Sequence, residues 1–188
     1  VVGGDRLQVE PVLVGRSADK LSALAKQHDI AHWTTDLDAA LADPQARIYF
    51  DAQVTSARKE AILKGLAAGK HIFTEKPIAE SVADGLELVS AAEQAGAITG
   101  VVHDKLYLPG LVKLKRLIDL GFFGRILSVR GEFGYWVFEG DIIPAQRPSW
   151  NYRAEDGGGM VLAKFCHWNY DLENLFGRVE AVTAKAVT

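Results

Sequence analysis

The chain has 188 residues, of which 48% are hydrophobic and 24% charged, with a formal net charge of −3. That length allows one full domain, or one domain and part of a second. Acidic and basic residues are interspersed, and no apolar run reaches membrane-spanning length, which argues against nucleic-acid and membrane partners. The single cysteine, Cys166, excludes an intrachain disulfide framework and favours a reducing compartment, so we expect a cytoplasmic protein.

Up to about residue 102, short apolar runs alternate with amphipathic stretches. Strands are expected over residues 11–15, 47–51, 70–74 and 97–102, and helices over residues 17–28, 36–41, 56–68 and 81–95. Strands separated by helices in this way predict an α/β fold with a parallel sheet and helical crossovers.

The ends of these helices carry local signals. Ser17 or Asp19 is expected to cap the first helix, and Thr35 or Asp36 the second. Gly69 follows the third helix and suits the left-handed conformation in which many helices end. These signals support the helical interpretation independently of the apolar pattern.

The pattern changes after residue 102. We expect a helix over 109–120, a β-rich aromatic segment over 124–138, an irregular segment over 140–155, a helix over 160–175 and a strand over 179–187. The change indicates two domains, residues 1–102 and 103–188. A strand at the last residue needs neighbours, and no strand–Gly-x-Gly–helix unit precedes the first strand. We therefore expect both domains to be incomplete in this sequence.

The tripeptide Glu75-Lys76-Pro77 follows the apolar run of residues 70–74. Open α/β sheets bind ligands at the carboxyl ends of their strands. The proline disfavours helical geometry at Lys76, so the lysine would project from the strand end. A cation there can hold a substrate hydroxyl or carbonyl close to a cofactor. The alternative is a solvated lysine before a proline that begins a helix.

Another expected strand ends at Gly15-Arg16-Ser17. In a dinucleotide-binding fold, an acidic residue at the end of the second strand binds the ribose 2′-hydroxyl, whereas an arginine accommodates a 2′-phosphate. Arg16 therefore favours NADP weakly over NAD, and the alternative is a solvated arginine beside a capping serine. Cofactor contacts are also expected at a further strand end, at Asp51, Gln53 and Thr55.

The helix expected over 160–175 begins after three glycines, residues 157–159, where backbone can approach a ligand closely. His167 lies on this helix and can exchange a proton near neutrality. The alternative is a histidine that lies in the core, with its hydrogen bonds made, and has no catalytic role. Substrate contacts are expected from Asn151, Tyr152, Arg153 and Lys105. Aromatic and hydrogen-bonding residues suit a polyhydroxylated ligand. The alternatives are an aromatic loop that packs the domain junction and an Asp104–Lys105 ion pair without further role. No metal-ligand spacing is present, so no metal is expected.

Together these segments resemble the Gfo/Idh/MocA family of NAD(P)-dependent sugar oxidoreductases. The resemblance rests on residues 68–79 with their Glu-Lys-Pro, on residues 120–126, and on the three glycines with the downstream His167, and it covers essentially the whole chain. It implies a Rossmann-type dinucleotide-binding domain followed by an α/β domain with a large, mostly antiparallel sheet. That sheet commonly mediates oligomers, so a homodimer or homotetramer is expected.

The resemblance also implies roles by position. Lys76 matches the family lysine that contacts the reacting hydroxyl, in a lysine–proline peptide that is often cis, and Glu75 and Pro77 accompany it at the cofactor. His167 matches the acid/base histidine of the family pattern Gly-Gly-Gly-x-x-x-Asp-x-x-x-His.

Two departures from the family stand out. The aspartate of that pattern falls on Ala163, which cannot accept a hydrogen bond, and the adjacent Lys164 points about 100° round the helix. The family's Asn-x-Arg falls near residues 104–106, where it is absent. The first departure removes a group that would orient the substrate.

The sequence thus predicts hydride transfer between NAD(P) and a secondary alcohol or ketone of a sugar or an inositol-like cyclic polyol. Lys76 would hold the substrate oxygen, and His167 would take or give the proton. Two alternatives stay open. One is a non-catalytic NAD(P)- or sugar-binding protein, which Ala163 favours. The other is a redox-neutral sugar-modifying enzyme that retains its cofactor.

Overall fold

The computed structural model describes residues 8–133, 153–156, 159 and 161–185. They divide into two compact units. The first unit comprises Val1–Asp51, Lys59–Phe73 and Leu86–Gly100, and the second comprises Ala52–Arg58, Thr74–Gly85 and Val101–Thr188. The chain therefore passes between the units several times, at the ends of strands and within helices.

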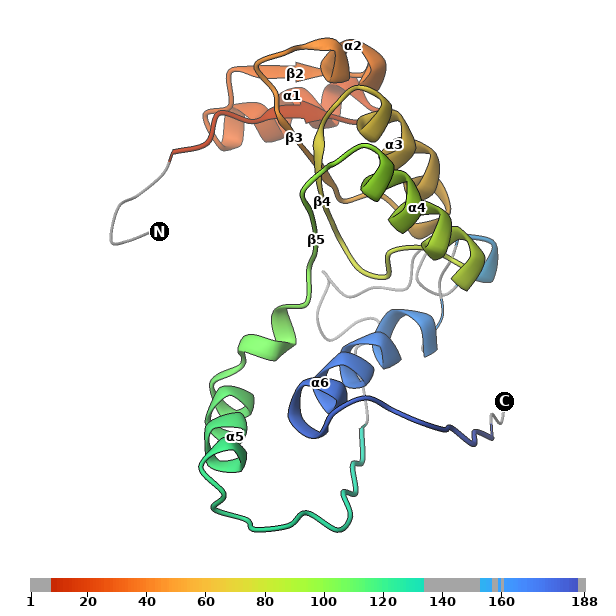
Figure 1. The fold of residues 1–188 in the computed structure, drawn as a ribbon. Coiled ribbons are helices and arrows are strands. Elements are labelled where there is room, and N and C mark those ends of the chain that lie inside the picture. The colour runs from red at the N-terminus through yellow and green to blue at the C-terminus, as the bar shows by residue number, and fades with distance from the viewer. Residues whose placement is uncertain (1–7, 134–152, 157–158, 160, 186–188) are drawn as a thin grey trace. The chain divides into compact units, whose positions relative to one another are not determined.

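Strands and helices alternate from Val12 to Val101 (Figure 1), as the apolar pattern indicated. The elements are β1 Val12–Val14, α1 Ala18–Gln27, β2 His32–Thr34, α2 Leu37–Ala42, β3 Ile48–Asp51, α3 Thr55–Ala67, β4 His71–Thr74, α4 Val82–Gln94 and β5 Thr99–Val101. The four strands and four helices expected in this half are all present, with bounds that differ by one or two residues. Strand β2 was missed, because its His-Trp-Thr sequence has no apolar run.

The strands form two small sheets. Strands β1 and β2 pair in parallel, with Val12 opposite His32 and Val14 opposite Thr34. A three-stranded sheet has the order β3-β4-β5. The hydrogen bonds from Ile72 N to Ile98 O and from Val102 N to Thr74 O advance in the same direction along β4 and β5, so these strands are also parallel. The expected parallel α/β arrangement is confirmed.

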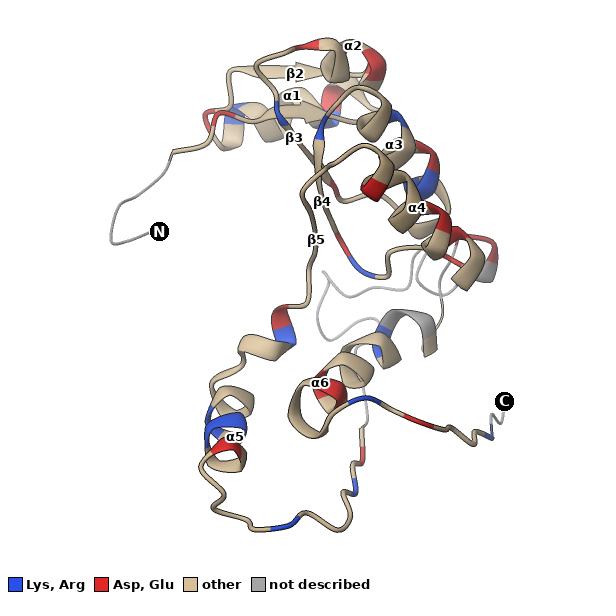
Figure 2. Ribbon diagram, viewed as in Figure 1, with Lys and Arg blue, Asp and Glu red and all other residues tan. Residues whose placement is uncertain are grey.

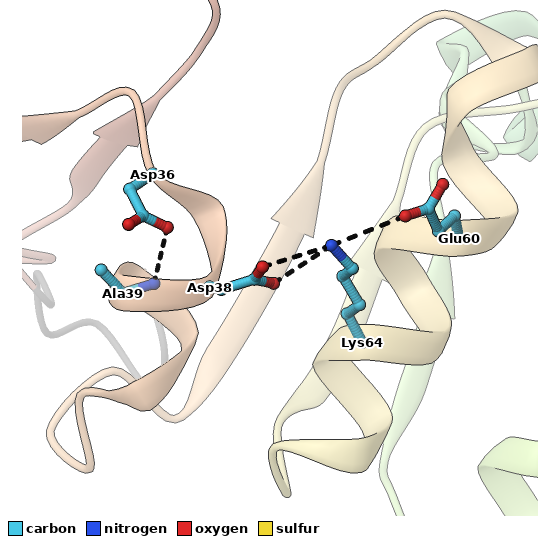
Figure 3. Close-up of polar contacts among 5 residues, drawn as sticks. All are labelled: Asp36, Asp38, Ala39, Glu60 and Lys64. Carbon is cyan, nitrogen blue, oxygen red and sulfur yellow. Dashed lines mark hydrogen bonds and ion pairs between the residues drawn. The ribbon is translucent and has the colours of Figure 1, made fainter.

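Side-chain caps fix the starts of α1 and α2. The Ser17 hydroxyl accepts a hydrogen bond from the backbone N–H of Lys20 at 3.4 Å, and the Asp36 carboxylate accepts one from Ala39 N–H at 3.0 Å. Figure 3 shows the Asp36 cap beside a surface ion pair in which Lys64 of α3 reaches Asp38 of α2 at 3.2 Å. These contacts identify Ser17 and Asp36 as the caps among the candidates that the sequence offered.

The core of the first unit lies between helices and sheet. Its buried apolar side chains are Leu21, Ala25, Leu41, Ala61, Ile62, Leu66, Ile72 and Leu88. Helix α3 approaches the sheet closely at Gly65, where a Cβ atom would lie 3.0 Å from Ile72 Cδ1 and 3.1 Å from Tyr49 Cδ1. A side chain at this helix position would therefore require Ile72 and Tyr49 to shift by a few tenths of an ångström.

The second unit contains mainly helices. They are the 3₁₀ helix η1 Asp104–Tyr107, α5 Pro109–Asp119, the 3₁₀ helix η4 Ala154–Asp156, the π-helix η5 Val161–Phe165 and α6 Cys166–Phe176. The helix expected over 160–175 is thus a π-helical turn followed by an α-helix. The ribbon in Figure 2, coloured by residue type, has acidic and basic residues interspersed along α3 and α5. Among the described residues, no helix is both long and apolar enough to cross a bilayer.

Two expected strands are wrong for the residues that the structure describes. Residues 124–133 and 179–185 contain no strand, although both segments alternate apolar and polar side chains. The alternation calls for a sheet face, yet Leu127 and Val182 are 84% and 75% exposed. A strand also needs a hydrogen-bonded neighbour, and no described segment supplies one. The large antiparallel sheet is therefore not seen, and residues 134–138 and most of 140–155 lie outside the described part.

Candidate active site

The Lys76 turn follows β4 directly. Val102 N–H donates to Thr74 O at 2.9 Å and so holds the last residue of β4 against the chain that follows β5. In the turn, the Glu75 carboxylate accepts a hydrogen bond from the backbone N–H of Lys76 at 3.2 Å. The Lys76–Pro77 peptide bond is cis, as the family resemblance implied.

Arg58 ties this turn to the loop after β3. The Arg58 side chain is only 2% exposed, and its guanidinium donates to the backbone carbonyls of Pro77 and Gln53, the latter at 2.6 Å. One buried cation thus joins two loops at which cofactor contacts were expected. Sequence reasoning missed Arg58, because a basic residue in the first turn of a helix gives no sign that it is buried.

Thr55 lies three residues before Arg58, at the start of α3. The residue is 2% exposed, and its hydroxyl oxygen has no hydrogen-bond partner among the described residues. A buried hydroxyl without a partner costs free energy unless a ligand satisfies it. Thr55, in the first turn of a helix whose backbone N–H groups favour anionic groups, therefore fits a polar group of NAD(P).

His167 lies in the first turn of α6 and is 4% exposed. Its Nδ1 atom is hydrogen-bonded to the Tyr170 hydroxyl one turn further along. The Tyr170 ring stacks on His103, with ring centroids 3.9 Å apart and planes inclined by 20°. Neither Tyr170 nor His103 was expected at the site. The i, i+3 spacing of Tyr170 from His167 on a helix was the only sequence signal for either residue.

Positive charge surrounds His167. Its pKa falls from 6.5 to about 4, first because burial disfavours the imidazolium and then because Lys76 and Lys105 repel it; Asp104 opposes this fall, and Lys164 adds to it. The pKa of Lys164 is likewise lowered by burial and by Lys76 and Lys105. His167 is therefore neutral at physiological pH and can accept a proton.

Two acidic residues complete the cluster. Asp104 pairs with Lys105 at 2.7 Å. This ion pair was the alternative to a substrate contact in the interpretation of Lys105 from the sequence. Asp171 is 3% exposed, and neither carboxylate oxygen has a hydrogen-bond partner among the described residues. Burial, and then repulsion by Asp104, raises the pKa of Asp171. Among the described residues, no group of His, Cys, Asp and Glu side chains could hold a metal ion.

The other expected site residues lie in different places. Arg153 is exposed and pairs with Asp156 at 2.5 Å, while Asn151 and Tyr152 lie outside the described residues. Four of the expected cofactor residues belong to the first unit: Gly15, Arg16, Ser17 and Asp51. Arg16 is exposed, Ser17 caps α1, and the buried Asp51 accepts a hydrogen bond from the Tyr49 hydroxyl at 3.1 Å.

The second unit thus contains Gln53, Thr55, Glu75, Lys76 and Pro77 together with His167. A lysine ammonium close to a neutral imidazole can stabilise an alkoxide and accept the proton that leaves a hydroxyl. That pair of functions is what the oxidation of an alcohol to a carbonyl requires from a protein.

The sequence matches two families that correspond to the two parts of the chain. Residues 5–103 match the oxidoreductase family with an NAD-binding Rossmann fold, and residues 111–188 match the GFO/IDH/MocA C-terminal domain. The chain belongs to the Gfo/Idh/MocA family of oxidoreductases. It consists of an α/β Rossmann NAD-binding domain and a C-terminal domain.

Individual relatives sharpen this assignment. The chain is 60% identical over 185 residues to D-xylose dehydrogenase of Paenarthrobacter nicotinovorans. The aligned residues make up 98% of this chain and 48% of the relative. It is 30% identical over 127 residues to 2,7-anhydro-N-acetylneuraminate hydratase of Escherichia coli K12, over 68% of this chain and 33% of that protein. The chain therefore spans about half the length, or less, of these relatives.

Solved structures show the same fold. The structure of levoglucosan dehydrogenase in complex with NADH and levoglucosan superposes with a TM-score of 0.79, at 23% identity, over 90% of this chain and 45% of that one. At this identity the likeness supports the fold alone.

Proposed function

We propose that the chain belongs to an NAD(P)-dependent sugar dehydrogenase that transfers a hydride between NAD(P) and a secondary alcohol or ketone of a sugar or cyclic polyol. D-xylose is the first substrate to test, because the 60%-identical relative is a D-xylose dehydrogenase. The observation that carries the proposal is that Lys76 and His167 belong to one unit, where Lys76 is, after burial, the main cause of the lowered pKa of His167.

In the oxidation direction, Lys76 hydrogen-bonds to the substrate oxygen and favours its alkoxide form. The neutral imidazole of His167 accepts the proton of that hydroxyl, which becomes a carbonyl as the C–H bond breaks. When bound, the nicotinamide supplies the acceptor for the hydride. Reduction runs through the same groups in reverse. Arg58, Gln53 and Thr55 would hold the cofactor against the Lys76 turn, and Asn151, Tyr152, Arg153 and Lys105 stay proposed substrate contacts.

The test is an absorbance assay of NAD(P)H formation with a panel of sugars and cyclic polyols, using the full-length protein. Lys76→Met should lower kcat by about 100- to 1,000-fold, the usual cost of losing one group that stabilises an oxyanion. Lys113→Met is a matched control, because Lys113 is an exposed lysine of α5 outside the cluster. Equal losses in both variants, or none in either, would reject the assignment of Lys76.

We also propose that Arg16 tilts the cofactor preference toward NADP. Arg16 is exposed at the end of β1, where a guanidinium can pair with a 2′-phosphate. Arg16→Ala should lower kcat/KM for NADP more than for NAD. A wild-type kcat/KM for NAD at least equal to that for NADP would contradict this preference.

A redox-neutral reaction is a second candidate, favoured by the likeness to a relative named as a hydratase. In that case a cofactor held through purification would oxidise the sugar and then be reoxidised within the same cycle. Retained cofactor and substrate conversion without net NAD(P)H would support it. A non-catalytic family member would bind NAD(P)H in a fluorescence titration and convert no sugar.

Three broader expectations stay proposals. The domain boundary would fall between residues 102 and 103, the protein would be cytoplasmic, and a large antiparallel sheet of the second domain would mediate a homodimer or homotetramer. Light scattering of the full-length protein measures the subunit count directly. A monomer at micromolar concentration would remove the proposed oligomer.

A further inference from the structure

His167 needs a group that holds its Nδ1 atom if its Nε2 atom is to face a substrate. In enzymes that use an imidazole as a base, a partner on the second ring nitrogen fixes both the tautomer and the ring orientation. The family pattern would place a carboxylate at position 163 on the same helical segment, but this chain has Ala163 there. An alanine methyl group can neither accept nor donate a hydrogen bond.

Tyr170 is in contact with the second nitrogen of His167. It lies three residues after His167 on α6, and its hydroxyl is hydrogen-bonded to Nδ1. The phenol ring is itself held from another element, because His103, just before η1, stacks on it at 3.9 Å. The hydroxyl therefore reaches His167 from a ring that packing on His103 restrains, rather than from a freely rotating side chain.

We propose that Tyr170 is a positioning residue that holds Nδ1 of His167 and fixes the tautomer of the imidazole. The Nδ1–H of His167 donates to the Tyr170 hydroxyl oxygen, and Nε2 is left with a free lone pair for the proton of the substrate. The proposal rests on the proposed function in one respect only: the tautomer that it assigns is the one that a proton acceptor at Nε2 needs.

A phenol differs chemically from the carboxylate that holds the imidazole in a Ser-His-Asp triad. It carries no charge at neutral pH, so it orients the ring without stabilising the imidazolium that forms during proton transfer. The low pKa of His167, with burial and Lys76 as its main causes, agrees with a partner that adds no negative charge. The chain thus keeps the orienting part of the usual arrangement and gives up the electrostatic part.

Asp171 is the competing candidate, since it is buried one helical turn after His167. Its two carboxylate oxygens, however, make no hydrogen bond to any described residue. The charges that act on Asp171 are those of Asp104 and Lys105. The geometry therefore assigns the orienting role to the Tyr170 hydroxyl and not to the carboxylate of Asp171.

The test compares Tyr170→Phe with Tyr107→Phe in the full-length protein. Phenylalanine at 170 keeps the ring that stacks on His103 and removes only the hydroxyl. Tyr107 is 77% exposed in η1, so the same change there controls for the substitution itself. The first readout is the tautomer of His167 by ¹⁵N NMR of the imidazole, assigned with His167→Gln, and it needs neither substrate nor cofactor. The second is kcat and KM on whichever sugar is turned over.

We expect the wild type and Tyr107→Phe to hold the Nδ1–H tautomer, and Tyr170→Phe to shift toward Nε2–H. Its kcat should fall by about 10- to 100-fold, the loss seen when a metal-ligating imidazole loses the partner that orients it, with KM little changed. An Nε2–H tautomer in the wild type, or an unchanged tautomer in Tyr170→Phe, would overturn the proposal. A wild type without activity on any sugar would instead count against the proposed function, and the tautomer measurement would still decide the role of Tyr170.

Discussion

A buried histidine among lysines behaves as a weak base that stays neutral over most of the pH range in which enzymes work. Among the residues that the structure describes, Lys76, Lys105 and Lys164 lower the pKa of His167 electrostatically, and Asp104 opposes them. Removing a proton from a cation in such a site is favourable, and adding one is not. The residue is therefore suited to accept a proton late, from a hydroxyl that Lys76 has already polarised.

This arrangement predicts an unusual pH profile. An oxidation that needs neutral His167 should keep its kcat/KM as the pH falls through 6.5 and lose it only as the pH approaches about 4, the lowered pKa of His167. Lys164→Met removes one of the smaller repulsions, so it should raise that pKa and move the acid limb to higher pH. Lys113→Met, on the exposed side of α5, should leave the limb in place. An acid limb near 6.5 in the wild type would contradict the account of the site.

Arg58 stabilises the Lys76 turn through backbone carbonyls. Replacing it by methionine keeps most of the side-chain volume but removes the donor to the carbonyl of the buried Pro77 and to that of the exposed Gln53. A buried carbonyl left unsatisfied costs about 1–3 kcal/mol, so the loss at Pro77 alone should make Arg58→Met lower the free energy of unfolding measurably in urea. The control is Arg130→Met, because Arg130 pairs with Glu132 while its side chain is 87% exposed. Similar small effects in the two variants would refute a special role for Arg58.

At the scale of elements, α3 packs on the sheet through Gly65. A methyl group there would meet Ile72 and Tyr49 at 3.0–3.1 Å, tighter than ordinary contact. Gly65→Ala should therefore lower the free energy of unfolding by about 1–3 kcal/mol through overpacking. Gly85→Ala is the matched control, since Gly85 lies within α4 and a Cβ atom there would meet nothing within 4 Å.

The control has an expected sign of its own. Alanine is the better helix former, so Gly85→Ala should raise the free energy of unfolding by up to about 1 kcal/mol. Denaturant titrations of the two variants measure both effects. Stabilisation by Gly65→Ala would show that Ile72 and Tyr49 move aside at little cost and that overpacking does not govern this position.

The elements of the first half were readable from sequence because their signals are local. Apolar runs, the Asp36 cap and the glycine at 69 act over a few residues, and every helix there and every strand except β2 was anticipated. Strand β2 was not, since His32–Thr34 become a strand only by pairing with β1. The strands expected at 124–133 and 179–185 failed for the opposite reason. Their alternating pattern is local, but the hydrogen-bonded neighbours that a strand needs are not among the described residues.

The site followed the same division. Lys76 and His167 could be named from their surroundings in the sequence, and the structure places them in one unit. Arg58, His103 and Tyr170 could not, because their importance comes from burial and from contacts between segments distant in sequence. The sequence showed that Ala163 departs from the family pattern. Only the structure shows that the Tyr170 hydroxyl is hydrogen-bonded to His167.

At the scale of the whole molecule, the proposed activity rests on membership of the family and on 60% identity to a D-xylose dehydrogenase. The chain spans 48% of that relative. We propose that Lys76 and His167 act on one sugar while its hydride moves to NAD(P). The full-length protein and a measurement that follows the hydride itself are needed to test this.

That measurement is mass spectrometry of the reduced cofactor after reaction with D-xylose deuterated at its carbon-bound positions. Deuterium should appear in the NAD(P)H formed by the wild type and by Lys113→Met. Lys76→Met and His167→Gln should form much less of this deuterated NAD(P)H. Cofactor that binds but gains no deuterium from D-xylose or from any other deuterated sugar of the panel would contradict the account.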